Sequence, residues 1–269
     1  TVPRVKAHQA IASLALAAGC GRVGFGAARG AGDGGADGGA DAGGDAAAGC
    51  AWASDGLLPA DQQSPSDDWE PALRPGGALL VFASSRSGTT RLYASARVGA
   101  GWSPPAELSV GGSFAAGPAW SAAGDRLYFV SDATTYGLHS ASYDGTSFGP
   151  AVREADAGWP GGIDAPWVSA DGLRLYFTRS TNDRGLLLAA CAAVGQPWVV
   201  QGAVPGLPPP GGGAGVVDGW PTLTSDELTL YFETTRADPA GDIHVARRAR
   251  AGDAFGAPEP VPALAVPGV

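Results

Sequence analysis

The 269-residue chain is poor in charge and has almost no lysine. Charged residues make up 16% of it, methionine is absent, and lysine occurs once, at Lys6. An ordinary soluble domain carries about 25% charged residues. Acidic groups outnumber basic groups by 26 to 17. Since a nucleic-acid partner requires clustered basic side chains to neutralise its phosphates, this composition argues against nucleic-acid binding.

Apolar runs long enough to cross a bilayer are also lacking near the N-terminus. Residues 10–18 form an apolar run of nine residues, whereas a transmembrane helix needs about 20. Arg4 and Lys6 precede this run, and small residues follow it. This order is typical of a secretory signal peptide, and we expect residues 1–19 to form one.

The stretch Leu16-Ala17-Ala18-Gly19-Cys20 resembles a bacterial lipobox. In that motif, small residues precede a cysteine that is lipidated and becomes the new N-terminus. The resemblance implies lipidation at Cys20 and a lipid-anchored location in the bacterial cell envelope, at the outer membrane or facing the periplasm. Contact with the membrane would then be made only through the lipid. The alternative is a plain secretory signal with an incidental cysteine.

Residues 20–50 consist mainly of Gly, Ala and regularly spaced Asp. Each glycine inside a helix costs about 1 kcal/mol relative to alanine. A chain of this composition therefore favours a flexible coil. We expect these residues to be a tether between the anchor and a folded domain at 51–269.

The remaining chain contains an internal repeat rich in Gly, Pro and aromatic residues. Four units, at about 66–110, 111–155, 160–207 and 216–264, share the same order of short apolar segments, turns and aromatic residues. Phenylalanines align at intervals of 47, 48 and 55 residues, at Phe82, Phe129, Phe177 and Phe232.

Each unit is predicted to contain four short strands, because Asp-Gly and Gly-Asp turns separate alternating apolar segments. No segment after the signal shows a sustained helical period. A single small sheet cannot bury its aromatic face, so successive sheets are expected to stack around an axis. The predicted fold is all-β, a β-propeller of four-stranded blades preceded by a disordered tether. Four visible repeats leave open a four-bladed ring or an incomplete six-bladed one.

The third unit carries the best-kept motif, Pro-x-x-Ser-x-Asp-Gly-x-x-Leu-Tyr-Phe, from Pro166 to Phe177. It resembles the WD40-like (PD40) repeat of TolB-type β-propellers, and the resemblance covers about residues 66–264. The fourth unit departs from it, with Ser225-Asp226-Glu227 in place of the Asp-Gly turn. TolB-type propellers bind protein partners near the envelope. The resemblance thus implies a non-catalytic binding module for a protein or another envelope ligand.

Motifs for catalysis or for a cofactor are lacking. No His-Glu-x-x-His, Gly-x-Ser-x-Gly or phosphate-binding loop occurs. His139 and His244 occupy the same place in two repeats, which the repeat itself explains. We therefore expect no enzyme activity, no cofactor and no metal site. The alternative is a propeller-type glycosidase or lyase acting on envelope or extracellular polysaccharide, and glycosidase chemistry requires two carboxylates placed across the scissile bond.

Acidic residues precede the first strand in three of the four units. In a propeller this segment enters the innermost strand, so these carboxylates should gather near the axis. We expect them to form a rim that binds a cation or a basic partner; the alternative is that they only cap turns. The candidate ligand-binding residues are Asp68, Glu70, Asp164 and Asp218.

Cys50 and Cys191 are the cysteines outside the signal region. An oxidising envelope compartment permits a disulfide between them, and the alternative is that both remain free. We expect the protein to be a monomer.

Overall fold

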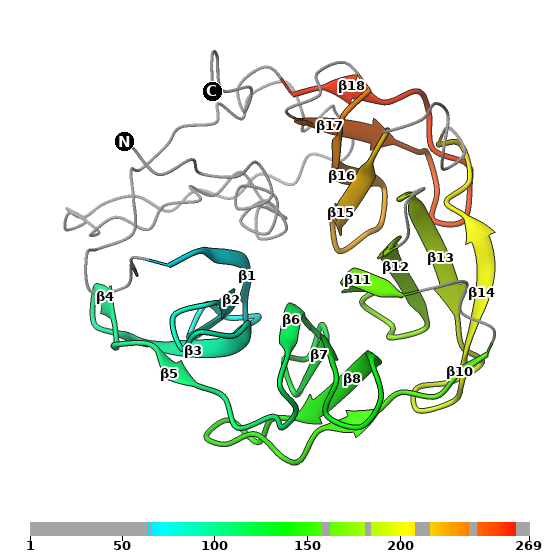
Figure 1. Ribbon diagram of the computed structural model, residues 1–269. Helices are drawn as coiled ribbons and strands as arrows, with labels where there is room; N and C mark the ends of the chain where they lie inside the picture. Colours follow the sequence, from blue (N-terminus) through cyan, green and yellow to red (C-terminus); the bar gives the residue numbers. More distant parts are fainter. Residues whose placement is uncertain are drawn as a thin grey trace, which may run out of the picture.

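The computed structural model describes residues 64, 66–157, 162–180, 184–207, 216–236 and 241–261. These residues contain strands and turns but no helix, and the strands form four sheets arranged around a common axis (Figure 1). The prediction of an all-β propeller is confirmed. Residues 1–63, which hold the predicted signal peptide, tether and Cys20, lie outside the described residues.

The first two blades span residues 68–153. Blade 1 contains β1 (Asp68–Leu73), β2 (Leu79–Ser84), β3 (Arg91–Val98), β4 (Gly101–Trp102) and β5 (Ala106–Glu107). Blade 2 contains β6 (Ala115–Trp120), β7 (Arg126–Ser131), β8 (Gly137–Ser142) and β9 (Val152–Arg153).

The other two blades follow the same plan. Blade 3 contains β11 (Ile163–Val168), β12 (Arg174–Arg179), β13 (Leu186–Ala190) and β14 (Trp198–Ala203), with β10 (Asp156–Ala157) running parallel to β14. Blade 4 contains β15 (Asp218–Leu223), β16 (Thr229–Thr234), β17 (Asp242–Arg247) and β18 (Glu259–Pro260).

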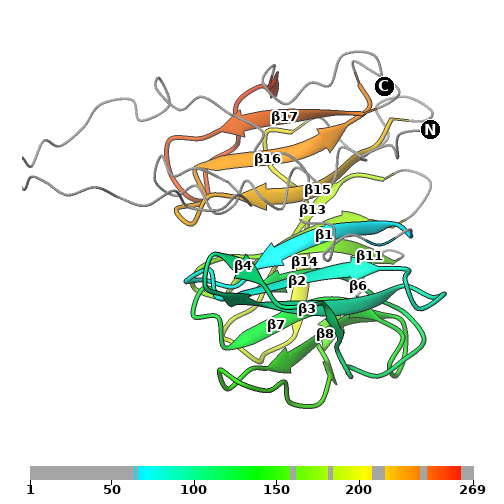
Figure 2. The ribbon, with the colours of Figure 1, turned by 90° about the vertical axis from the view of Figure 1, so that its left-hand side faces the viewer.

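Within each blade, the first three strands pair antiparallel in sequence from the axis outwards, and in blades 2, 3 and 4 the next strand outwards pairs antiparallel with the third. In blade 1 both β4 and β5 pair with β3. The first strands, β1, β6, β11 and β15, surround the axis, and the last strands lie at the rim (Figure 1). Figure 2 shows the sheets from the side. Because every inner strand enters at the axis, the repeat brings equivalent residues of four units together there.

The four aligned phenylalanines are buried, as the repeat predicts, and three of them lie between blades. Phe129 packs in a cluster with blade 1, Phe177 in one with blade 2, and Phe232 in one with blade 3. Phe82 is equally buried, on the face of blade 1 that points away from blade 2. Blades 2, 3 and 4 thus each present their phenylalanine to the blade before them, which makes the stacking directional.

A buried ion cluster joins blades 3 and 4. The Glu227 carboxylate accepts hydrogen bonds from the Arg174 guanidinium at 2.7–3.1 Å and from the Tyr176 hydroxyl at 3.1 Å. Arg248 lies 3.4 Å from the same carboxylate and donates to the Tyr176 hydroxyl at 2.9 Å. Glu227 has a φ of 59°, at the turn position that Gly172 holds in blade 3. The departure from the repeat motif therefore serves an inter-blade contact.

Candidate ligand-binding cavity at the propeller axis

A β-bulge interrupts the first strand of every blade at the same position. The residue at the bulge has a positive φ and is followed by proline in all four blades. A non-glycine residue in this conformation costs on the order of 1–3 kcal/mol and persists only where its surroundings hold it. The four bulge residues are Glu70 (φ 52°), Gly117 (60°), Ala165 (43°) and Trp220 (52°).

Side chains fix the peptide groups of three bulges. The Gly117 N–H donates to Oε2 of Glu70 at 2.7 Å, and the Trp220 N–H donates to Oγ1 of Thr178 at 2.8 Å. Both acceptors belong to the preceding blade. The Ala165 N–H donates to Oδ1 of Asp164, its own neighbour, at 3.0 Å. In blades 2 and 4, the hydrogen bond that fixes the bulge thus also ties the blade to the preceding one.

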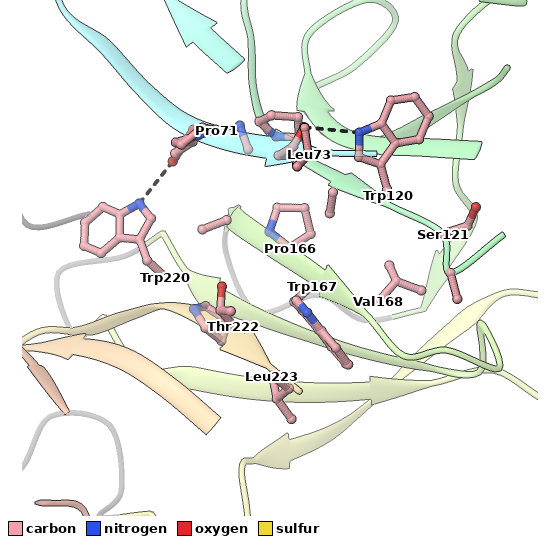
Figure 3. Close-up of a pocket in the computed structure, with 18 of the residues that line it drawn as sticks. Pro71, Leu73, Trp120, Ser121, Pro166, Trp167, Val168, Trp220, Thr222 and Leu223 are labelled. Carbon is pink, nitrogen blue, oxygen red and sulfur yellow. Dashed lines mark hydrogen bonds between the residues drawn. The ribbon is translucent and has the colours of Figure 1, made fainter. Parts of the chain in front are cut away.

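A cavity of about 370 Å³ lies on the axis (Figure 3). All four blades line it, from each bulge to the turn that follows the inner strand. Its exposed lining residues are in those turns, at Pro75, Ala122, Ala170 and Ser225. The cavity therefore opens on the face formed by the hairpins between first and second strands.

The cavity wall is mainly apolar. Its volume falls in the range of about 300–1,000 Å³ that is usual for small-molecule pockets. Among the described lining residues, the only ionisable side chain is that of Glu70. The bulk of the wall comes from the repeated prolines and from tryptophans and aliphatic residues: Pro71, Pro118, Pro166, Pro221, Trp120, Trp167, Trp220, Leu73, Val168 and Leu223.

A hydrogen bond fixes the ring of Trp120 in the cavity wall, and an aromatic contact fixes that of Trp167. Nε1 of Trp120 donates to the Ala72 carbonyl of blade 1 at 3.3 Å, as Figure 3 shows. The Trp167 ring meets Tyr176 edge to face at a centroid distance of 5.7 Å. Rings fixed in this way offer flat apolar surfaces at little further cost in conformational entropy.

Glu70 connects three blades at the bulge end of the cavity, opposite the hairpin face. Its carboxylate accepts the Gly117 N–H of blade 2 and, at 3.0 Å, the Nε1–H of Trp220 in blade 4. The residue is only 8% exposed. Of the four acids proposed from the sequence, Glu70 is the one that lines the cavity.

Asp68 and Asp218 are equivalent residues, each two positions before a bulge. Asp68 lies 3.0 Å from Nη2 of Arg86, and the buried Asp218 lies 2.6 Å from Nη2 of Arg236. Both arginines follow the second strand of the same blade. Asp164 is one position further along its strand and pairs in register with Thr178. It therefore does not occupy the strand position that Asp68 and Asp218 share. These three acids are not part of the cavity wall, and their role in ligand binding remains a prediction.

The other predicted sites have structural surroundings. His139 is fully buried, with its ring nitrogens 3.0 Å from the Gly137 carbonyl and 3.2 Å from the Thr134 hydroxyl. Cys191 is a buried free thiol, and burial raises its pKa; Cys50 lies outside the described residues. Across the described ranges, no group of three or more His, Cys, Asp or Glu side chains could hold a metal ion. The same ranges hold no helix able to span a membrane.

The tryptophans and prolines of the cavity were not proposed as site residues from the sequence. The sequence does show an aligned proline that lies one or two positions from a tryptophan in three units, in Pro118-Ala119-Trp120, Pro166-Trp167 and Trp220-Pro221. That pattern predicts the inner strand, but it gives no sign that the strand bulges and turns these side chains toward the axis.

No family model and no curated protein matches the chain. Among solved structures, it is similar to a xylan β-1,4-xylosidase from Bacillus halodurans, with 13% identity, a TM-score of 0.52, and coverage of 72% of this chain and 44% of that one. An endo-1,4-β-xylanase from Bacteroides thetaiotaomicron has 14% identity, a TM-score of 0.51, and coverage of 75% and 77%.

TolB from Acinetobacter baumannii has 13% identity and a TM-score of 0.47, with 72% of this chain and 43% of that one covered. The chain spans 63% of a TolB-like protein from Agrobacterium tumefaciens, so it covers less than two thirds of either TolB structure. At these identities the similarity concerns the fold alone, which is that of a β-propeller.

Proposed function

We propose that this chain is a non-catalytic binding module of the bacterial cell envelope, anchored by lipid at Cys20. Its axial cavity receives an apolar group of a protein or another envelope ligand, entering from the hairpin face. The observation that carries the proposal is the cavity wall, which combines fixed tryptophans and prolines with a single buried carboxylate. Apolar walls with a few placed polar groups are usual in ligand sites.

The rival function is a propeller-type glycosidase. Two of the structural neighbours are named as xylan-degrading enzymes. Glycoside hydrolysis needs two carboxylates about 5–10 Å apart on either side of the bond. The described part of the wall offers only Glu70, which already accepts hydrogen bonds from Gly117 and Trp220. This favours binding over hydrolysis.

A matched pair of variants tests whether the cavity mouth is the binding site. Ala122 and Ala123 are both exposed in the turn after β6, but only Ala122 lines the cavity. Ala122→Trp should block the mouth, while Ala123→Trp should leave it open. With wild type and both variants immobilised, a partner captured from an envelope extract should be lost with Ala122→Trp alone. Equal capture by all three would place the site elsewhere.

A second experiment measures whether the purified wild-type protein and Glu70→Gln hydrolyse xylan. The proposal predicts no release of reducing sugar by wild type. Release that disappears in Glu70→Gln would replace the binding proposal by the glycosidase alternative.

A further inference from the structure

The wall of the axial cavity is built in layers, because the four blades contribute residues at equal distances along the chain from their bulges. The layer three positions after each bulge is apolar throughout and consists of Leu73, Trp120, Val168 and Leu223. The layer one position after each bulge consists of the four prolines. A ligand that enters from the hairpin face therefore passes two apolar layers before it reaches the bulges.

Charge in the described wall is confined to the layer of the bulges. Of the four bulge residues, only Glu70 has an ionisable side chain, and it lines the cavity. The hydroxyl side chains of the described wall, at Ser121, Thr222 and Ser225, are uncharged. The guanidinium of Arg184 lies 5.5 Å from the centroid of the Trp220 ring, but Arg184 does not line the cavity. The described wall thus carries charge of one sign, at its bulge end.

The Glu70 carboxylate is held in place by an N–H donor on each of its oxygens. The Gly117 N–H bonds to Oε2 at 2.7 Å, and the Nε1–H of Trp220 bonds to Oε1 at 3.0 Å; Figure 3 shows the second of these bonds. This arrangement suits an ionised carboxylate, which only accepts hydrogen bonds. Both donors are neutral groups, so these two bonds fix the position of the carboxylate and do not neutralise its charge.

The depth of the cavity sets the length of a ligand that reaches Glu70. The exposed residues at the mouth each stand five positions after a bulge, at Pro75, Ala122, Ala170 and Ser225. Five residues of strand span roughly 15 Å, and a ligand entering at the mouth has to extend over a comparable depth. The four-carbon stem of a lysine side chain is much shorter. A single long chain therefore suits the cavity better than a basic side chain on the surface of a partner.

Three classes of long-chain ligand differ in how they suit this wall. A neutral chain gains from the two apolar layers, but its far end meets the Glu70 carboxylate. An alkyl carboxylate is disfavoured there, because two like charges repel each other strongly where water is excluded. An alkylammonium buries its chain against the same layers and brings its cation to the carboxylate, where a charge-assisted hydrogen bond is stronger than a neutral one. The layered wall therefore favours the cationic class.

We propose that the axial cavity binds a single-chain alkylammonium. The alkyl chain lies against the two apolar layers, and the ammonium group lies at Glu70. The inference rests on the proposed function, because it names the chemical class of ligand that the binding module receives. Glu70 then sets the specificity of the cavity for charge, while the tryptophans, prolines and aliphatic residues of the wall bind the chain.

Calorimetric titration of the full chain with three ligands of equal chain length tests the preference for a cation. Wild type should bind n-octylammonium about tenfold more tightly than n-octanol, which is the factor that a charged in place of a neutral hydrogen bond provides. It should bind n-octanoate most weakly. Every titration stays below the concentration at which the ligand self-associates. Glu70→Gln should remove the difference between n-octylammonium and n-octanol.

The mouth variants show whether these ligands enter the cavity. Binding of n-octylammonium should be lost in Ala122→Trp and kept in Ala123→Trp, and this pair together with the order of the three ligands in wild type decides the outcome even if Glu70→Gln does not fold. Binding that survives Ala122→Trp, or no binding to wild type, would overturn the inference.

The inference and the proposed function can fail separately. Equal affinity of wild type for n-octylammonium and n-octanol would overturn the preference for a cation and leave an apolar binding cavity in place. Capture of an envelope partner that Ala122→Trp does not reduce would instead overturn the cavity as the site of the proposed function.

Discussion

Glu70 shows how one side chain can serve as both a joint and part of a binding surface. It occupies a left-handed bulge position, accepts two hydrogen bonds across blade boundaries, and ends in the axial cavity. Its burial follows from these bonds, since a buried carboxylate is tolerated when donors surround it.

Replacing Glu70 by alanine should lower the free energy of unfolding by about 1–3 kcal/mol, because the Gly117 and Trp220 donors lose that acceptor. Urea denaturation followed by tryptophan fluorescence measures this. The control is Glu259→Ala, whose carboxylate is 74% exposed and 3.9 Å from Arg247; such surface pairs contribute little, and its effect should stay within about 0.5 kcal/mol. Similar losses in both variants would contradict a joining role for Glu70.

The burial of His244 should make the stability of the protein depend on pH. Burial lowers its pKa below the ordinary 6.5; the carboxylates of Asp242 and Asp218 raise it, and Arg236 lowers it. Below about pH 6.5 the unfolded chain therefore binds a proton at this residue more readily than the folded protein does, so this contribution to stability is lost as the pH falls.

We expect the free energy of unfolding to decline between about pH 7 and pH 5, with a shallower decline in His244→Gln. Urea titrations at a series of pH values provide the comparison. Identical slopes in the two proteins would mean that His244 titrates alike in the folded and unfolded states.

At the scale of elements, the blade 3–4 interface departs from the repeat. Glu227 takes a turn position at which glycine would avoid strain, and it gains contacts with Arg174, Arg248 and Tyr176. The Arg248 side chain is only 2% exposed. Removing one partner of a buried ion pair costs about 3–5 kcal/mol, because the other charge is left uncompensated.

Glu227→Gly should thus destabilise the protein by about 3 kcal/mol, even though glycine suits the positive φ better. Chemical unfolding compares it with Glu227→Gln, which keeps the side-chain length and should cost less. A neutral or stabilising Glu227→Gly would show that turn strain outweighs the ion cluster.

At the scale of the whole molecule, the sequence predicts a propeller held near a membrane by lipid. Multiple acyl chains on one cysteine would meet the two-signal requirement for stable anchoring. Expressed with its N-terminal region in a bacterial host, the wild-type protein should partition into detergent, and Cys20→Ser should remain in the aqueous phase. If both proteins fractionate as soluble, the lipid anchor is wrong.

The three acids Asp68, Asp164 and Asp218 were expected to precede the inner strands and to converge near the axis. They lie within those strands instead: Asp68 and Asp218 are the first residues of β1 and β15, and Asp164 is the second residue of β11. Register separates Asp164 from the other two, and arginines of the same blade bind Asp68 and Asp218. One position along a strand turns a side chain to the other face, and a repeat alignment with insertions cannot fix that position.

Local periodicity and turn chemistry, which each unit repeats, were sufficient to predict the all-β propeller, the four visible repeats and the burial of Phe82, Phe129, Phe177 and Phe232. The bulges of the inner strands became evident from the three-dimensional arrangement of the blades. The same arrangement shows that five prolines and three tryptophans line one cavity and that Glu70 joins three blades there. These depend on side chains brought together from distant blades, and no segment of the chain encodes that meeting alone.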